Sequence, residues 1–296
     1  MLRRIVFTSL FLIVISCDST DFSVLDNEIV IELTLVANEP LPPARVSKLA
    51  PADQMSQPED LAVSDAEVIL STGTTDFLME PVTNKPGSYL YLGPEHIIQP
   101  GARYDLLVTV PGMETAITGM TNVPTSAKIL NASRKSGTYL SDERLTLILT
   151  PGRGSDQSQS SLTLVTEALD VKTEAVVPSV SGLLEDDDDL TLEDFRVSAS
   201  PIITEGNFTR LPDETIELVY PWIGVNFYGR NIIYVNALDE NLAGFVRSAE
   251  LQQGGGGTFG PGVIPNVIPS LSGAHGVFGS VARDWVRFTV FPPADE

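Results

Sequence analysis

The sequence predicts an all-β protein built from two β domains and one short helix. Several runs alternate apolar and polar residues with a period of two, which is typical of strands with one buried face. Glycine and proline, 23 and 21 of 296 residues, divide these runs with turn signals. Hydrophobic residues make up 43% of the chain, so it can form packed cores.

Residues 28–124 are expected to form the first domain. In Glu28–Asn38, apolar residues recur at every second position from Ile29 to Leu35, which predicts a strand, whereas the proline-rich residues 39–63 predict a long surface loop. Short strands joined by Gly/Pro turns form antiparallel sheets that stack as a sandwich. Further strands are expected within Asp65–Thr72, Pro86–Gly93, Ile97–Gly112 and Glu114–Pro124.

Residues 125–296 are expected to form a second, β-rich domain. Arg144–Gly152 and Ser161–Leu169 look like a strand pair around a polar loop, and Thr215–Leu238 and Asp284–Phe291 read as further strands. Between these last two, Asp239–Gly254 changes to three- and four-residue spacing of its apolar side chains. This spacing predicts the one helix, capped by Asp239 at its start and Gly254 at its end.

The first residues have the three parts of a secretory signal. Arg3 and Arg4 are basic, Ile5–Ile15 is almost wholly apolar, and small Ser16 precedes Cys17. The apolar run is too short to span a bilayer, which takes roughly 20 apolar residues. We therefore expect residues 1–16 to be a signal peptide.

Cys17 is the only cysteine of the chain. An unpaired cysteine in an exported protein calls for an explanation. Its place just after the signal, with Val14 and Ser16 before it, resembles the lipobox of bacterial lipoproteins, in which this thiol receives a diacylglycerol. Residues 17–27 would then be a lipidated tether. The alternative is a plain signal peptide followed by an incidental cysteine.

The formal net charge is −21. A chain this acidic repels phosphate backbones, so nucleic acid is not expected as a partner. It also repels anionic membrane surfaces, so the lipid rather than a basic patch would attach the protein to its membrane.

Two sequence patterns resemble known families. The stretches "DAEVIL", "PGSYLYL", "IQPGARYDLLVTVPG" and "NVP" resemble the repeated scheme of transthyretin-like and carboxypeptidase-regulatory-like sandwiches. This resemblance implies that the first domain is an immunoglobulin- or transthyretin-like β-sandwich.

The second pattern resembles the carboxy-terminal end of Bacteroidetes-type lipoproteins classed as domain-of-unknown-function family 4249. Their scheme places an asparagine, glycines and a phenylalanine where this chain has Asn266, Val267, Gly273, Gly276, Phe278 and Gly279. The resemblance implies a lipid-anchored protein of the outer membrane, on its surface or periplasmic face. Such lipoproteins are often encoded beside TonB-dependent receptors, which implies an accessory or ligand-binding role for such a transporter and no known chemistry.

Catalytic and metal signatures are sparse. The two histidines, His96 and His275, lie in expected turns, and no G-x-S-x-G elbow occurs. We expect a non-catalytic protein without a cofactor; the alternative is a surface hydrolase that cleaves glycan or peptide with carboxylates the sequence does not single out. Asp186 and Asp188, in the run "EDDDD", are candidate calcium ligands, although a solvated acidic loop is the favoured interpretation.

Aromatic residues gather between Tyr220 and Tyr234. Trp222 and Tyr228 are candidates for a binding platform, because flat exposed rings bury much area at little cost in conformational entropy. Core positions are the favoured alternative, since strand alternation buries about half of such residues.

The lipobox predicts a specific chemical change at Cys17. Cys17→Ala removes the acylated sulfur and should release the protein from membranes, whereas Ser16→Ala keeps a small residue before the cysteine and should leave the lipid in place. Mass spectrometry of the mature amino terminus measures both outcomes. An unmodified Cys17 thiol in the membrane-bound parent protein would rule out the lipoprotein interpretation.

Overall fold

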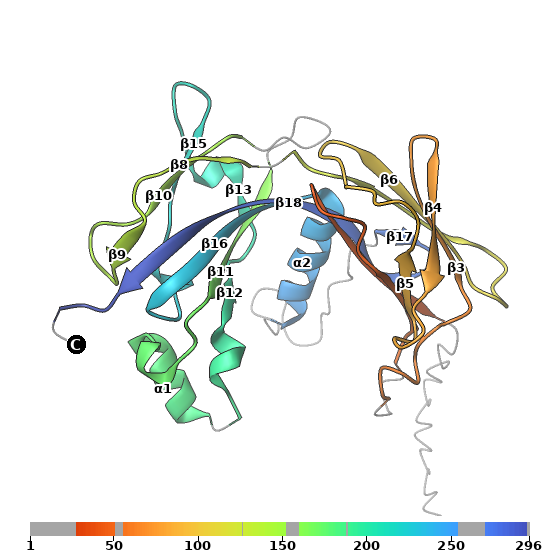
Figure 1. Ribbon diagram of the computed structural model, residues 1–296, viewed down its shortest axis with the longest axis horizontal. Coiled ribbons are helices and arrows are strands. Elements are labelled where there is room, and N and C mark those ends of the chain that lie inside the picture. The colour runs from red at the N-terminus through yellow and green to blue at the C-terminus, as the bar shows by residue number, and fades with distance from the viewer. Residues whose placement is uncertain are drawn as a thin grey trace, which may run out of the picture.

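The structure, a computed structural model, describes residues 28–50, 56–125, 127–151, 160–187, 189–253 and 270–294. Strands dominate and are accompanied by two α-helices, so the predicted all-β class is confirmed. Figure 1 shows two β-rich halves at the ends of an arch, with the long strand β18 (His275–Phe291) running from one half to the other. Cys17 and the tether lie outside the described residues.

The amino-terminal half is one antiparallel sheet that curls around its own core. From the parallel contact of β1 with β18, its strand order is β1-β2-β5-β4-β3-β6-β7-β17. Because the sheet curls, β7 returns to contact β18. The strands are β1 (Ile29–Val36), β2 (Ala44–Lys48), β3 (Glu67–Thr72), β4 (Thr75–Pro81), β5 (Ser88–Tyr91), β6 (Arg103–Thr109), β7 (Ile117–Asn122) and β17 (Leu271–Ser272).

Alternation explains most of this half, but β2, β4 and β17 were not predicted from the sequence. In β1, Ile29, Ile31, Leu33 and Leu35 are buried, as period two predicts. β2 lies within the predicted loop 39–63, hidden by the prolines before it, but its buried Ala44 and Val46 face the same core. β4 was missed because its buried Phe77 and Met79 are separated by apolar Leu78, which hides the alternation.

The second half stacks a four-stranded sheet on the strands next to β18. The small sheet has the order β14-β15-β10-β8, and the facing part of the large sheet has the order β12-β11-β16-β18. Buried side chains of both sheets form a second core. The strands are β8 (Ile129–Ala132), β9 (Ser136–Thr138), β10 (Thr146–Leu149), β11 (Ser161–Ala168), β12 (Val197–Ala199), β13 (Ile203–Thr204), β14 (Thr209–Arg210), β15 (Ile216–Val219) and β16 (Gly229–Leu238).

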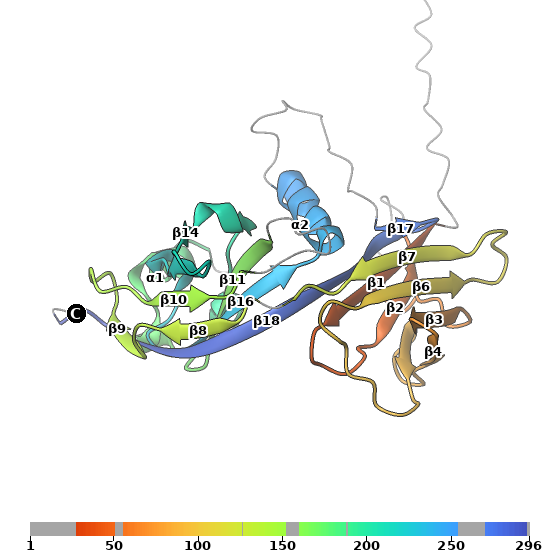
Figure 2. The same cartoon turned by 90° about the horizontal axis from the view of Figure 1, so that it is seen from above.

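One expected pairing is wrong. The strands within Arg144–Gly152 and Ser161–Leu169 do not pair with each other, because β10 pairs with β15 and β8 whereas β11 pairs with β16. The two strands therefore belong to the two facing sheets of the second core, as Figure 2 shows from above.

The helices comprise the predicted one and an additional one. α2 (Glu240–Gln253) confirms the helix expected over Asp239–Gly254, and its start is capped by Asp239, whose Oδ1 accepts the amide of Leu242 at 2.9 Å. α1 (Pro178–Asp186) was not expected; Pro178 starts it and Val180 is its buried side chain. Short 3₁₀ turns lie at η1 (Thr173–Ala175), η2 (Leu192–Phe195), η3 (Glu205–Asn207) and η4 (Trp222–Gly224).

None of the helices in the described part of the chain is long and apolar enough to cross a bilayer.

β18 joins the two halves through its backbone. Its first part pairs in parallel with β1, from Val30↔His275 to Val36↔Val281. Its second part pairs antiparallel with β16, from Leu238↔Val281 to Gly229↔Val290. β18 belongs to the expected second domain, residues 125–296. Even so, its Phe278 and Ala282 pack in the first core, while its Phe288 and Val290 pack in the second. Sequence alternation indicated only Asp284–Phe291, because glycines interrupt the earlier part.

Because the two cores share β18, a substitution that destabilises the first core should also destabilise the second. Phe278→Ala should cost about 3–5 kcal/mol of unfolding free energy. In a Trp285→Phe background, Trp222 in the second core is the remaining tryptophan. Its fluorescence transition in urea should shift to lower denaturant together with the far-ultraviolet circular dichroism.

Leu78→Ala is the control, because Leu78 is an exposed side chain of the first half and its loss should move neither transition. A Phe278→Ala protein whose Trp222 transition keeps its midpoint would show that the halves unfold independently.

Candidate functional site

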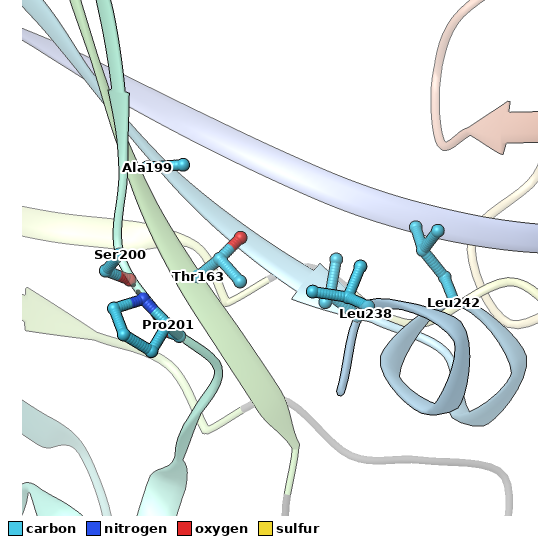
Figure 3. A pocket seen from close by; sticks show the side chains of 7 residues that line it. Thr163, Ala199, Ser200, Pro201, Leu238 and Leu242 are labelled. Carbon is cyan, nitrogen blue, oxygen red and sulfur yellow. Dashed lines mark hydrogen bonds between the residues drawn. The ribbon is translucent and has the colours of Figure 1, made fainter. Parts of the chain in front are cut away.

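An apolar groove lies where the helix α2 meets the second half. Its volume is about 520 Å³. Figure 3 shows Leu238 and Leu242 on one side of it and Ser200 and Pro201 on the other, with Thr163 between them. Within the described chain the groove is lined by Thr163, Ala199, Ser200, Pro201, Leu238, Leu242 and Val246.

Local sequence explains both walls of the groove. Leu238 ends β16, and Leu242 and Val246 are four residues apart on one face of α2, so they line the groove together. Across from them, Ser200 is fixed by three hydrogen bonds. Its amide donates to the Leu164 carbonyl at 2.8 Å, and its hydroxyl accepts the Leu164 amide at 2.9 Å and donates to the Pro201 carbonyl at 2.8 Å.

A buried carboxylate sets the position of α2. Asp239 Oδ1 accepts the amides of Leu242 at 2.9 Å and Ser280 at 3.0 Å, while its Oδ2 accepts the Thr121 hydroxyl at 2.6 Å. The Thr121 and Ser280 hydroxyl oxygens lie 2.6 Å apart. The three side chains come from β7, the start of α2 and β18, so one polar cluster links the first half, the helix and the shared strand.

Two neighbours complete this joint. Asn241 donates its side-chain amide to the carbonyls of Met120 at 2.6 Å and Phe278 at 2.9 Å. Gly279 lies so close to α2 that an added Cβ would meet Leu242 Cβ at 2.9 Å and Asp239 Oδ1 at 3.1 Å. The first turn of the helix therefore packs directly on the backbone of β18.

Burial raises the pKa of Asp239, although the surrounding hydrogen-bond donors act in the opposite direction. We interpret the carboxylate as a structural joint, because each of its oxygens accepts hydrogen bonds from the protein itself.

The glycines of the carboxy-terminal pattern have structural reasons. Gly273 and Gly276 have φ of +88° and +94°, and a Cβ at Gly276 would lie 2.1 Å from the Ile31 carbonyl oxygen. Phe278 is fully buried in the first core. Asn266 and Val267 lie outside the described residues. The described part of the pattern therefore encodes the contact of β18 with β1 and α2.

The predicted binding aromatics lie inside the second half. Trp222 is 6% exposed, its indole N–H donates to the Ser141 carbonyl at 2.9 Å, and its ring packs on Phe288. Tyr228 is partly buried and meets Tyr139 edge to face at 5.7 Å between ring centroids. A ring as buried as Trp222 offers no face to a ligand, so the favoured core interpretation holds for Trp222 and the binding platform is not formed there.

The predicted calcium ligands are not brought together within the described chain. Asp186 is exposed at the end of α1, and Asp188 lies outside the described residues. Over the described ranges, acidic, histidine and cysteine side chains form no group of three that could hold a metal ion. Calcium binding by this run stays a prediction.

Neither histidine is among the described residues that line the groove, and each contacts another side chain elsewhere. His96 Nε2 lies 2.8 Å from the Tyr104 hydroxyl and its ring packs on Phe77, and burial lowers the pKa of His96. His275 Nε2 lies 2.5 Å from Glu28 Oε2 at the start of β18.

Comparison of the sequence with protein-family models found no match, and comparison with curated proteins found none either.

The sequence predicted the helix, the spacing of its apolar side chains and Asp239 as its cap, but not the groove. It gave no sign that β12 would pair beside β11, because a strand this short carries too little alternation to be recognised.

The raised pKa of Asp239 predicts a pH dependence of stability. The folded state holds the proton more tightly than the unfolded chain, so this contribution is fully present below the unfolded pKa, about 3.9, and is lost as pH rises through the raised folded pKa. Asp239→Asn keeps an acceptor for Leu242 and Ser280 but does not titrate. The unfolding free energy of the parent relative to Asp239→Asn should therefore fall as pH rises through this window.

Asp239→Ala leaves buried donors unpaired and should cost about 1–3 kcal/mol more than Asp239→Asn at every pH. Urea titrations across the acidic range measure both effects. A difference between parent and Asp239→Asn that grows with pH would contradict the assignment.

Proposed function

We propose that the protein is a non-catalytic cell-envelope lipoprotein, attached to the outer membrane through a lipid on Cys17, that serves a TonB-dependent outer-membrane transporter as an accessory or ligand-binding partner. The carboxy-terminal pattern that resembles the lipoprotein family supports the envelope role. The observation that carries a binding role is the groove between α2 and the edge of the second half.

The groove has the chemistry of a contact site. Its lining is mainly apolar, with hydroxyl groups from Ser200 at one side and from Thr163 between the two walls. Apolar concave surfaces with a few fixed polar groups are the usual form of binding sites for ligands and for partner side chains. The lining residues that the structure describes supply apolar contacts and two hydroxyl groups, a chemistry that suits binding of an apolar group.

The architecture supports a platform role. A tether of residues 17–27 would precede β1, so the lipid would attach near the first half, while the groove belongs to the second half. The shared strand β18 and the Asp239 joint connect the two, so the groove is held in a fixed relation to the attached half.

The proposal predicts co-purification with a TonB-dependent receptor from detergent-solubilised envelopes. Val246→Glu puts a charge into the apolar groove and should lower the receptor recovered by about tenfold, because an unpaired buried charge is costly. Leu183→Glu, at an exposed position of α1, is the control and should leave recovery unchanged.

Two results would contradict the proposal. One is the absence of any receptor with the parent protein at native expression. The other is turnover of an envelope glycan or peptide by the purified protein.

A further inference from the structure

The open face of the large sheet beside the groove combines aromatic rings with arginines. Trp285 on β18 lies directly opposite Tyr234 on β16, and Tyr234 lies opposite Val165 on β11. In the neighbouring rows Arg287 lies opposite Ile232, and Arg283 lies opposite Asn236. Directly opposed residues share a face of the sheet, so these side chains form one surface, which we call the β18 face.

The β18 face is exposed. Trp285 is 49% exposed, and Arg283 and Arg287 on either side of it along the strand are exposed as well. The neighbouring positions Phe288 and Val290 point to the second core, so the exposed residues belong to the opposite side of the sheet. Large exposed aromatics next to arginines are the composition of energetically important positions in protein interfaces.

The two arginines are held by the rings. The guanidinium carbon of Arg283 lies 5.9 Å from the Tyr234 ring centroid, and that of Arg287 lies 5.6 Å from the Trp285 ring centroid. A guanidinium stacked on a ring keeps its N–H edge available to an acceptor. The rings thus hold the two guanidinium groups in position before a partner binds.

These cations stand out in an acidic chain. The net charge is −21, yet no ion pair within the described residues includes Arg283 or Arg287. Glu167, opposite Ile232 on β16, is already occupied: it pairs with Arg196 at 2.9 Å and accepts the Tyr234 hydroxyl at 3.1 Å. Glu39 also acts electrostatically on Tyr234 but forms no ion pair with either arginine among the described residues. The face therefore presents two positive charges that no ion pair among the described residues holds.

We propose that the β18 face binds an extended, acidic segment of a partner protein. The two arginines are four residues apart on one strand, about 13 Å, which is the distance between residues i and i+4 of another extended chain. Such a segment lying along β18 presents carboxylates to Arg283 and Arg287 and an apolar side chain between them to Trp285. Along Arg283–Arg287, β18 pairs with β16, whereas its pairing with β1 ends at Val281 and its pairing with β9 begins at Thr289. The segment lies over the β18 face and is held by the arginine and tryptophan side chains.

This inference goes beyond the proposed function, because it requires neither the lipid nor a transporter. Its test uses the purified full chain and a short dye-labelled peptide of the sequence Glu-Ser-Leu-Ser-Glu, with binding followed by fluorescence anisotropy at low salt. The parent should bind this peptide, and a peptide with glutamine in place of glutamate should bind at least about tenfold more weakly.

The variants locate the binding. Arg283→Gln/Arg287→Gln and Trp285→Ala should each weaken binding about tenfold or more. Arg45→Gln/Arg103→Gln removes the same charge from exposed positions of the first half and should change the affinity by less than about twofold. All of these positions are exposed, and circular dichroism checks that each variant is folded.

Three results would overturn the proposal: no binding of the peptide by the parent, equal losses in the two arginine pairs, or displacement of the peptide by polygalacturonate at equal carboxylate concentration. The last result would assign the face to an acidic glycan instead of a protein segment.

Discussion

The structure depends on one strand that takes part in two hydrophobic cores. The first part of β18 pairs with β1 and buries Phe278 in the curled amino-terminal sheet, and its second part pairs with β16 and buries Phe288 in the second half. A backbone that belongs to both cores transmits the position of one half to the other without a linker. Hydrophobic burial on both sides keeps the strand in one register, because a shift by one residue would expose both sets.

The remaining features follow from this strand. Gly279 lets α2 approach its backbone, and Asp239 fixes the start of the helix to Ser280 and, across the curled sheet, to Thr121. The helix in turn forms one wall of the groove with Leu242 and Val246. The side chains of β18 that alternate with its core positions, among them Trp285 and its neighbouring arginines, lie on the open face. The cores, the joint and the β18 face thus use different residues of β18, and the groove depends on the helix that packs on this strand.

The sequence predicted the all-β class, β1, the α2 helix and its Asp239 cap, because each of these has a strong local period or a capping residue. It did not predict β2, which follows several prolines, or the first part of β18, which glycines interrupt. At both places the local residue preference opposes a strand, and pairing with distant strands forms it. It paired β10 with β11 wrongly, since sequence neighbours need not share a sheet. The aromatics illustrate the same limit: composition drew attention to Trp222, which is buried, whereas the exposed Trp285 could be recognised only once the sheet's two sides were known.

Hydrogen exchange in the native protein tests the role of the shared strand most directly. With exchange followed by mass spectrometry at increasing urea, the amides of β1, β16 and both parts of β18 should reach the same opening free energy, equal to that of global unfolding. Peptides from the two parts of β18 that open at clearly different free energies, one half losing protection while the other keeps it, would contradict the account.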